Sequence, residues 1–157
     1  MNKEFAGRTY VVTGAARGIG LAVVKRLLNE GAHVHACDID AISPNNMHTG
    51  LNFHLIDVRD EESVAELFYS LKQSGEKING LVNNAAILDS TQFDELNSER
   101  IKEVLEINLG GTLNFTRYAV PLLEASVRSA IVNVASIQGI FGTRSSIPYS
   151  SSKGAIV

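Results

Sequence analysis

Residues 13–20 read Thr13-Gly14-Ala15-Ala16-Arg17-Gly18-Ile19-Gly20 and stand between the apolar run Tyr10–Val12 and the amphipathic stretch Leu21–Glu30. This order predicts a strand, a glycine turn and a helix. Glycines in such a turn let the backbone fold tightly and approach a bound group closely. The start of the helix offers free N–H groups and a partial positive charge, so we expect the turn to hold a dinucleotide pyrophosphate. A glycine turn without a ligand is the alternative, because the spacing T-G-x-x-x-G-x-G differs from the common G-x-G-x-x-G fingerprint.

The alternation of strand and helix continues along the whole chain. Strands are expected at residues 8–13, 33–38, 52–57, 80–83 and 130–136, with a loop at 39–50. Helices are expected at 21–30, after a cap at Asp60, from Asn97 or Ser98 to about residue 123, and from Pro148 to Val157. This pattern predicts an α/β fold, a Rossmann-type doubly wound parallel sheet with helices on both faces. We expect residues 1–157 to belong to a single domain of this kind.

Two glycines interrupt the long helix predicted after Asn97. Gly110 and Gly111 each cost about 1 kcal/mol relative to alanine inside a helix. A distortion of the helix next to Asn108, or close packing against a neighbouring element, would account for them.

Composition narrows the classes of function. The chain has 157 residues and a formal charge of −3, which argues against an electrostatic binder of nucleic acid or membranes. Neither a membrane span nor the apolar core of a signal peptide is expected from the sequence. Cys37 is the single cysteine and the four histidines lack metal-ligand spacing, so no disulfide and no metal site are expected. Together these features favour a cytoplasmic protein.

Polar side chains gather where the predicted strands end, which is where ligands bind in parallel α/β sheets. Asp38 ends the second strand. It follows the first strand by about 20 residues, the offset expected of a carboxylate that accepts hydrogen bonds from the adenosine ribose. Such a carboxylate repels a 2′-phosphate, so it favours NAD over NADP. Arg17 has the opposite effect, because a guanidinium beside the same ribose could pair with a phosphate. We give Asp38 more weight and interpret Asp40 as a solvated acid.

The chain resembles the short-chain dehydrogenase/reductase family. The matching stretches follow the family's order and spacing along nearly the whole chain, and they are Thr13–Gly20, Asp57-Val58, Asn83–Ala86, Asn108, Ser136 and Tyr149–Lys153. The resemblance implies cofactor-binding roles for Gly14, Arg17, Gly18, Ile19, Gly20, Asp38, Asp57, Val58, Asn84, Ala85, Tyr149 and Lys153. It implies catalytic roles for Asn108, Ser136, Tyr149 and Lys153.

Tyr149 and Lys153 are four residues apart, so they share one face of a helix. A nearby ammonium group stabilises tyrosinate, which suits Tyr149 to exchange a proton with an alcohol or ketone as hydride moves to or from a nicotinamide. The resemblance further implies that Lys153 holds the nicotinamide ribose and that Ser136 hydrogen-bonds the substrate oxygen. By the same resemblance, Asn108 holds a water that links Lys153 to solvent.

These implications define an expected function and its alternative. We expect an NAD(H)-dependent oxidoreductase that interconverts a secondary alcohol and a ketone, with NADP less favoured as cofactor. Its partner is a small-molecule substrate, and the resemblance implies a homodimer or homotetramer in a full-length form. A truncated dinucleotide-binding fragment or sensor without catalysis is the alternative.

The sequence departs from the family pattern in three places. The loop after Asp38 has room for little more than a turn, where family members often carry a helix. Ala86 replaces a commoner glycine. Family members also continue beyond the Tyr-x-x-x-Lys motif with two further strands and a loop over the substrate. The domain is therefore expected to be C-terminally incomplete, with the sheet truncated after its fifth strand and that strand left as a bare edge.

Overall fold

The computed structural model describes residues 3–157 and contains one five-stranded parallel sheet in the order β3-β2-β1-β4-β5. The strands are β1 (Thr9–Thr13), β2 (His33–Asp38), β3 (Leu51–Leu55), β4 (Gly80–Asn83) and β5 (Ala130–Asn133). The helices are α1 (Gly18–Asn29), α2 (Glu61–Gln73), α3 (Ser98–Leu105), α4 (Gly111–Glu124) and α5 (Ile147–Ile156). Short 3₁₀ turns lie at η1 (Pro44–Asn46), η2 (Phe93–Glu95) and η4 (Ile137–Gly139), and a π-turn, η3, spans Glu106–Gly110. The predicted α/β fold is confirmed.

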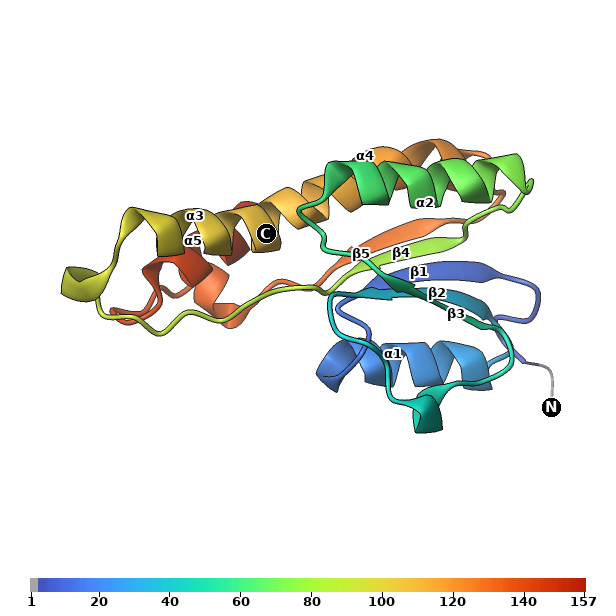
Figure 1. Cartoon of the computed structure of the whole chain (residues 1–157), viewed down its shortest axis with the longest axis horizontal. Helices are drawn as coiled ribbons and strands as arrows, with labels where there is room; N and C mark the ends of the chain where they lie inside the picture. The colour runs from blue at the N-terminus through green and yellow to red at the C-terminus, as the bar shows by residue number, and fades with distance from the viewer. Residues whose placement is uncertain (1–2) are drawn as a thin grey trace.

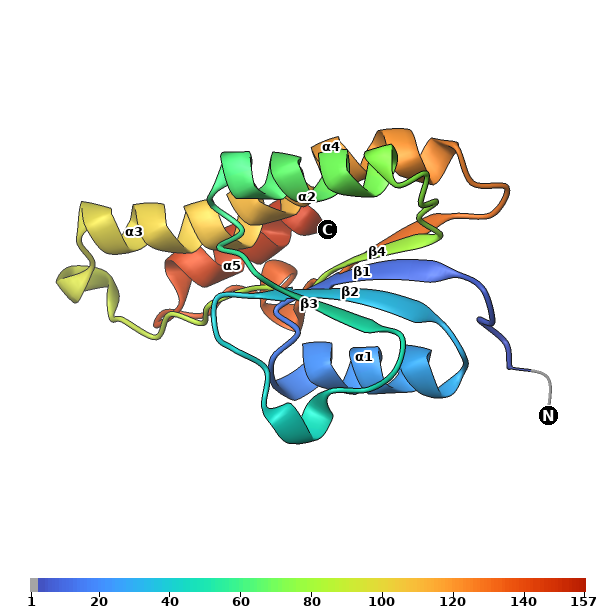
Figure 2. The same ribbon diagram turned by 45° about the vertical axis from the view of Figure 1, so that its right-hand side comes forward.

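Helices cover both faces of the sheet (Figures 1 and 2). Helix α1 lies on one face and helices α2 and α4 lie on the other, while α3 and α5 extend past the ends of the strands. Neighbouring residues of a strand point to opposite faces, so Val11 packs with Phe68 and Phe115 on the α2–α4 side. Val12 packs with the α1 side of the core, which includes Val24. This two-sided burial explains the continuous apolar runs of the central strands.

Side-chain caps start two of the helices as expected. Asp60 Oδ1 accepts a hydrogen bond from Ser63 N at 3.3 Å at the start of α2. Asn97, rather than Ser98, caps α3, because Asn97 Oδ1 accepts from Arg100 N at 2.8 Å. The loop before β3 forms only the single turn η1, in agreement with its predicted shortness.

The glycine pair in the long helix serves both purposes that the sequence suggested. The helix widens into the π-turn η3, which contains Asn108 and ends at Gly110. Gly111 follows directly, and a Cβ at this position would overlap Val58 Cγ2. Because Gly111 has no side chain, α4 approaches the segment after β3, which also lines the candidate site.

Strand β5 forms one edge of the sheet and pairs only with β4 within residues 3–157. The side chains of Ile131 and Val132 on it are exposed. The strand ends at Asn133, three residues before the predicted end at Ser136. That prediction was wrong because Ser136 caps the turn η4 instead, its Oγ accepting a hydrogen bond from Gln138 N. Strand β3 likewise ends at Leu55, so Asp57 lies in the connection that follows.

A partly buried polar cluster joins β2 and β3 to the segment after α2. His35 Nδ1 and His54 Nε2 share a hydrogen bond of 2.9 Å, and His35 Nε2 lies 3.1 Å from Glu76 Oε1. Glu76 Oε1 also accepts from Thr9 Oγ1 at 3.2 Å. Burial and the neighbouring His35 lower the pKa of His54, and Glu76 only partly offsets this effect.

We expect the free energy of unfolding to fall as the pH drops below 6.5, the ordinary pKa of histidine. In that range the unfolded chain takes up a proton at His54 that the folded chain resists, so acid favours unfolding. Urea unfolding at pH 7 and at about pH 5.5 measures the loss. His54→Gln removes this group, so its stability is expected to depend less on pH. An equal pH dependence in both proteins would contradict the assignment to His54.

None of the helices within residues 3–157 combines the length and the hydropathy that crossing a bilayer would require.

Candidate functional site

A cavity of about 270 Å³ opens at the carboxyl ends of β1, β2 and β4. In this sheet order β1 and β4 are neighbours whose following helices lie on opposite faces, which is the usual place for a ligand crevice. The cavity brings together most of the predicted cofactor-binding residues, namely Gly14, Arg17, Ile19, Asp38, Asp57, Val58, Asn84 and Ala85. Gly18 and Gly20 belong to the turn that forms its wall, whereas Tyr149 and Lys153 lie on α5.

Each glycine of the turn meets a different steric requirement. Gly14 has φ +63° and a Cβ there would lie 2.8 Å from Ala85 Cα, so this position needs glycine for both reasons. A Cβ on Gly20 would overlap Gly14 O, because the turn folds back on itself. Gly18 has φ +56°, and a Cβ there would meet no atom within 4 Å, so this position faces open space.

The first turn of α1 is left free for an anion. Arg17 is the N-cap, its side chain makes no capping hydrogen bond, and no acidic residue occurs in the first turn. The N–H groups and the partial positive charge at this helix end therefore lie beside the open space at Gly18. A pyrophosphate group fits these features.

Asn84 braces the glycine turn against β4. Its Nδ2 donates to the carbonyl oxygens of Thr13 and Gly14, each at 3.0 Å. Thr13 Oγ1 in return accepts from the backbone N–H groups of Asn84 and Ala85, also at 3.0 Å. No role for Thr13 was predicted from the sequence, although its hydroxyl joins the two walls of the cavity through these hydrogen bonds.

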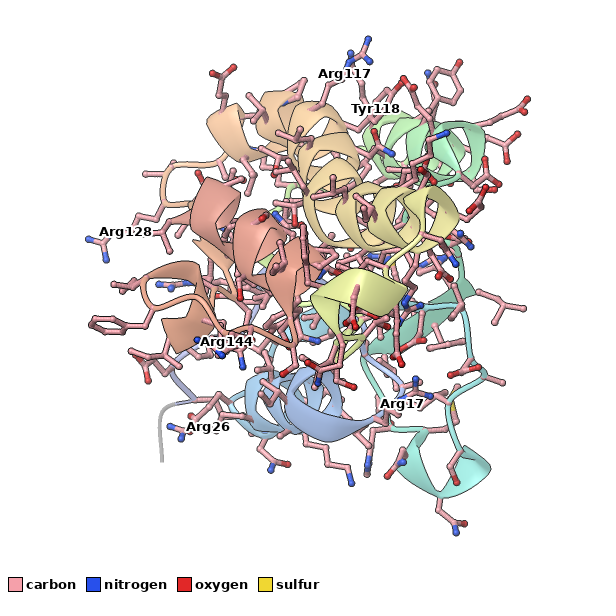
Figure 3. The ribbon with its side chains drawn as sticks, turned by 90° about the vertical axis from the view of Figure 1, so that its left-hand side faces the viewer. Arg17, Arg26, Arg117, Tyr118, Arg128 and Arg144 are labelled. Carbon is pink, nitrogen blue, oxygen red and sulfur yellow. The ribbon has the colours of Figure 1, made fainter. Side chains whose placement is uncertain are left out.

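Asp38 is buried at the end of β2 and ties that strand to the turn. Its Oδ2 accepts a hydrogen bond from Ala16 N at 2.8 Å, and its Oδ1 accepts from Asp40 N at 3.0 Å. Asp40 is not simply solvated, because it forms an ion pair with Arg17. Arg17 lies at the beginning of α1, beside the segment that follows β2 (Figure 3).

Asp57 pairs with Arg59, a partner that was not predicted from the sequence. Arg59 Nη2 donates to Asp57 Oδ2 at 2.6 Å, and Arg59 Nε lies 3.0 Å from both carboxylate oxygens. This pairing holds the pKa of Asp57 below its usual value. Arg59 also lines the cavity, and its position two residues after the predicted acid was the only signal for it in the sequence.

The π-turn places Asn108 in the interior, where its amide is fully engaged. Oδ1 accepts from Ile87 N at 2.9 Å, and Nδ2 donates to Ile87 O at 3.1 Å and to Ser152 Oγ at 3.0 Å. Asn108 therefore joins the loop after β4 to α5. Ser152, which precedes Lys153, was not among the predicted residues.

Tyr149 and Lys153 share one face of α5 as their spacing predicts. Lys153 Nζ lies 5.9 Å from the centroid of the Tyr149 ring and donates to Val134 O at 2.6 Å. Burial lowers the pKa of the Lys153 ammonium group. The hydrogen bond to Val134 anchors this buried cation at the end of β5.

Ser136 lies near α5 because the turn that it caps packs against that helix. It caps η4, and η4 lies directly against α5, because a Cβ on Gly139 would be 2.7 Å from Lys153 C. Within residues 3–157 no hydrogen bond joins Ser136 to Tyr149. The two segments approach each other closely at Gly139, a contact that was not predicted from the sequence.

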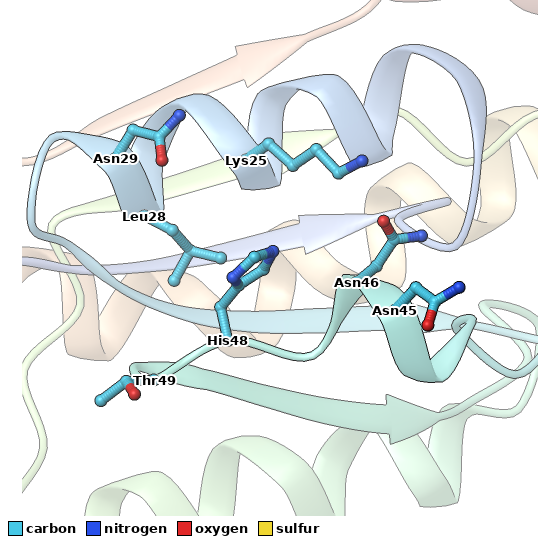
Figure 4. Close-up of a pocket in the computed structure, with 7 residues that line it drawn as sticks. All are labelled: Lys25, Leu28, Asn29, Asn45, Asn46, His48 and Thr49. Atoms are coloured by element: carbon cyan, nitrogen blue, oxygen red, sulfur yellow. The ribbon is translucent and has the colours of Figure 1, made fainter.

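A second hollow, of about 580 Å³, lies between α1 and the loop that carries η1 (Figure 4). Its lining consists of Lys25, Leu28, Asn29, Asn45, Asn46, His48 and Thr49, none of which was predicted as a site residue. Across the described part of the chain, no three histidine, cysteine or acidic side chains converge in a way that could hold a metal ion.

Comparison with known proteins links this geometry to one family. The family model for short chain dehydrogenases matches residues 8–157. An L-fucose dehydrogenase of Bos taurus is 33% identical over 160 residues, covering 99% of this chain and 59% of that protein. A 3-oxoacyl acyl-carrier-protein reductase of Thermotoga maritima is 31% identical over 158 residues, covering 96% of this chain and 64% of that protein.

A solved structure shares the same fold. The short chain dehydrogenase of Leptospira borgpetersenii with bound NAD+ matches with a TM-score of 0.92 at 25% identity, covering 99% of this chain and 63% of that one. The chain thus spans between 59% and 64% of the length of these three relatives.

Proposed function

Since the chain belongs to the short-chain dehydrogenase family, we propose that it catalyses the NAD-dependent interconversion of a secondary alcohol and a ketone. One observation supports this most. The glycine turn, Asp38 and the wall that Asn84 braces surround a single cavity at the carboxyl ends of the strands. Its relatives in the comparison include dehydrogenases and a reductase, and one of them carries bound NAD+.

In this proposal the phosphates bind at the free start of α1 and the adenosine ribose binds at Asp38. A nicotinamide dinucleotide held by these residues would supply the acceptor for the hydride of the alcohol carbon. Tyr149 takes the hydroxyl proton of the alcohol through its phenolic oxygen, and Ser136 hydrogen-bonds the same substrate oxygen. The ammonium group of Lys153 stabilises the tyrosinate form of Tyr149. Asn108 fixes the helix that carries both residues through its hydrogen bond to Ser152.

The choice of cofactor rests on Asp38. We expect isothermal titration to give at least tenfold tighter binding of NAD than of NADP, because a 2′-phosphate beside a buried carboxylate is repelled. Asp38→Asn removes the charge and nearly preserves the shape, so the preference is expected to shrink to about threefold or less. Tighter binding of NADP than of NAD by the unaltered protein would contradict this assignment.

The substrate is best sought among small alcohols. L-fucose, an aldohexose and simple cyclic secondary alcohols form a suitable panel, in which formation of NADH measures turnover. NAD binding with no turnover on any alcohol would support the alternative, a dinucleotide-binding unit without catalysis. Absence of both binding and turnover would contradict the cofactor site itself.

Assembly and location are part of the same proposal. The family resemblance suggests a cytoplasmic homodimer or homotetramer formed through the α3–α4 region and α5. Sedimentation velocity would measure the number of subunits.

A further inference from the structure

The segment that follows β4 carries a buried acid, Asp89, which has no part in the mechanism described so far. Only 1% of the surface of Asp89 is exposed. Its Oδ1 accepts hydrogen bonds from Arg100 Nε on α3 and from Thr91 Oγ1, both at 2.8 Å. The hydrogen bond from Arg100 holds the pKa of Asp89 below its ordinary value, although burial opposes the effect. The carboxylate is therefore charged, and this charge-assisted hydrogen bond fixes the segment against α3.

The start of α5 is hydrogen-bonded to the same residue. Ser146 is the buried N-cap of α5, and its Oγ donates to Asp89 O at 2.7 Å. A serine at this position ordinarily accepts a hydrogen bond from an N–H group of the first helical turn. The side chain of Ser146 makes no such capping bond, so its hydroxyl joins the helix to the segment after β4 instead. Tyr149 follows three residues later, in the first turn of that helix.

A second connection joins α5 to this segment. The side-chain amide of Asn108 bonds to the backbone N and O of Ile87, and its Nδ2 also donates to Ser152 Oγ. Ile87 lines the candidate cofactor cavity. Residues 87–89 therefore connect the cavity wall to both the beginning and the middle of α5. Helix α3, which holds Asp89 through Arg100, lies beside α5 past the ends of the strands (Figures 1 and 2).

We propose that Asp89 is a positioning residue for the proton transfer by Tyr149. Its carboxylate, held by Arg100, fixes the backbone carbonyl to which Ser146 bonds, and this bond places the start of α5 relative to the cavity. The inference rests on the proposed function, because it assumes that Tyr149 exchanges a proton with a substrate beside a bound dinucleotide. Tyr149 and Lys153 lie on one helix, so a shift of α5 moves both together and preserves their mutual arrangement.

The test is a cycle of four proteins, namely the unaltered chain, Asp89→Asn, Ser146→Ala and the double variant. Asp89→Asn removes the charge that Arg100 binds and nearly preserves the shape of the side chain. Ser146→Ala removes a hydroxyl alone, so it decides the outcome if Asp89→Asn fails to fold. Oxidation of the best alcohol of the panel gives kcat and KM at each pH, and calorimetry gives the affinity for NAD. Urea unfolding establishes that each protein is folded under the conditions of the assay.

Ser74→Ala is the matched control for Ser146→Ala. Ser74 is the C-cap of α2, and its Oγ donates to a backbone carbonyl, Leu71 O, at 2.9 Å. The substitution therefore removes the same kind of hydrogen bond from a position outside the cavity. Its kcat should equal that of the unaltered chain.

We expect each single substitution to lower kcat about tenfold, less than the 100-fold that a misplacement on the order of 1 Å can cost. The double variant should lose no more than the larger single loss, because both substitutions break one connection. KM and the affinity for NAD should stay within about threefold of their original values. The pH dependence of kcat should keep its midpoint, since Tyr149 and Lys153 move together.

Three results would overturn the role of Asp89 while leaving the proposed function intact. The first is an unchanged kcat in folded Ser146→Ala and Asp89→Asn, with only the stability against urea lowered, which would indicate a purely structural role. The second is a set of losses that multiply in the double variant, because the two residues would then act separately. The third is a shifted pH midpoint, which would place the effect within the pair of Tyr149 and Lys153. If the unaltered chain turned over no alcohol, the proposed function would fail, and the role of Asp89 would fail with it.

Discussion

Replacing Tyr149 by phenylalanine is expected to lower turnover about 100- to 10,000-fold, the range typical for loss of a general acid or base. The substitution removes only the phenolic oxygen and keeps the ring beside Lys153. Helix α5 should therefore keep its place, and NAD affinity should change by less than about threefold. Turnover is measured by NADH formation with the best alcohol of the panel, and affinity by calorimetry.

Tyr69→Phe provides the matched control for this experiment. Tyr69 is exposed on α2, and the substitution removes the same oxygen atom from a position outside the candidate site. Its turnover should equal that of the unaltered protein. Normal turnover in Tyr149→Phe would show that another group transfers the proton. A large loss in both variants would point to a general effect on folding.

The features that the sequence revealed are those encoded by neighbouring residues. The apolar run before the glycine turn, the helical spacing of Val24 and Leu27 after it, and the cap at Asp60 are local signals. Parallel topology follows from the alternation of strand and helix. Because the carboxyl ends of parallel strands meet at one edge, the gathering of Gly14 and Asp38 at one cavity could also be predicted.

The contacts that the sequence did not reveal join segments far apart in the chain. The bonds from Asn84 to Thr13, and the pairing of Arg17 with Asp40, depend on how β1, β2 and β4 align. No periodic pattern encodes such contacts. Gly110 and Gly111 did signal an irregular helix, but only the structure identifies Val58 as the neighbour that Gly111 accommodates.

The position of Ser136 illustrates the same limit. Residues 130–136 have the composition of one continuous strand, yet pairing with β4 ends at Asn133. Beyond that point the hydroxyl of Ser136 accepts a hydrogen bond from Gln138 N at 3.2 Å, and the turn η4 begins. Local capping thus overrides strand propensity over three residues and turns the chain toward α5.

The contact between η4 and α5 leads to the second large effect, which concerns Gly139. A Cβ on Gly139 would lie 2.7 Å from both C and O of Lys153 and 2.9 Å from Gly154 N. These are backbone atoms of α5, so they cannot rotate away as a side chain would. In Gly139→Ala either η4 or α5 must move, and Ser136 separates from the helix that carries Tyr149.

We therefore expect Gly139→Ala to lower turnover about 100-fold, the cost of a misplacement on the order of 1 Å in a catalytic group. Overpacking of this kind should also lower the free energy of unfolding by about 1–3 kcal/mol. Affinity for 5′-AMP should stay unchanged, because the glycine turn and Asp38 lie on other elements. Turnover, urea unfolding and calorimetry measure these three quantities separately.

Gly142→Ala is the control that isolates the contact from the effect of losing a glycine. Residue 142 follows η4 closely, yet a Cβ there meets no atom within 4 Å and the backbone has no positive φ. This variant should keep full turnover and gain up to about 1 kcal/mol of stability, because alanine restricts the unfolded chain. If Gly139→Ala behaved in the same way, the packing of η4 on α5 would be too loose to position Ser136. The catalytic arrangement would then need a different support.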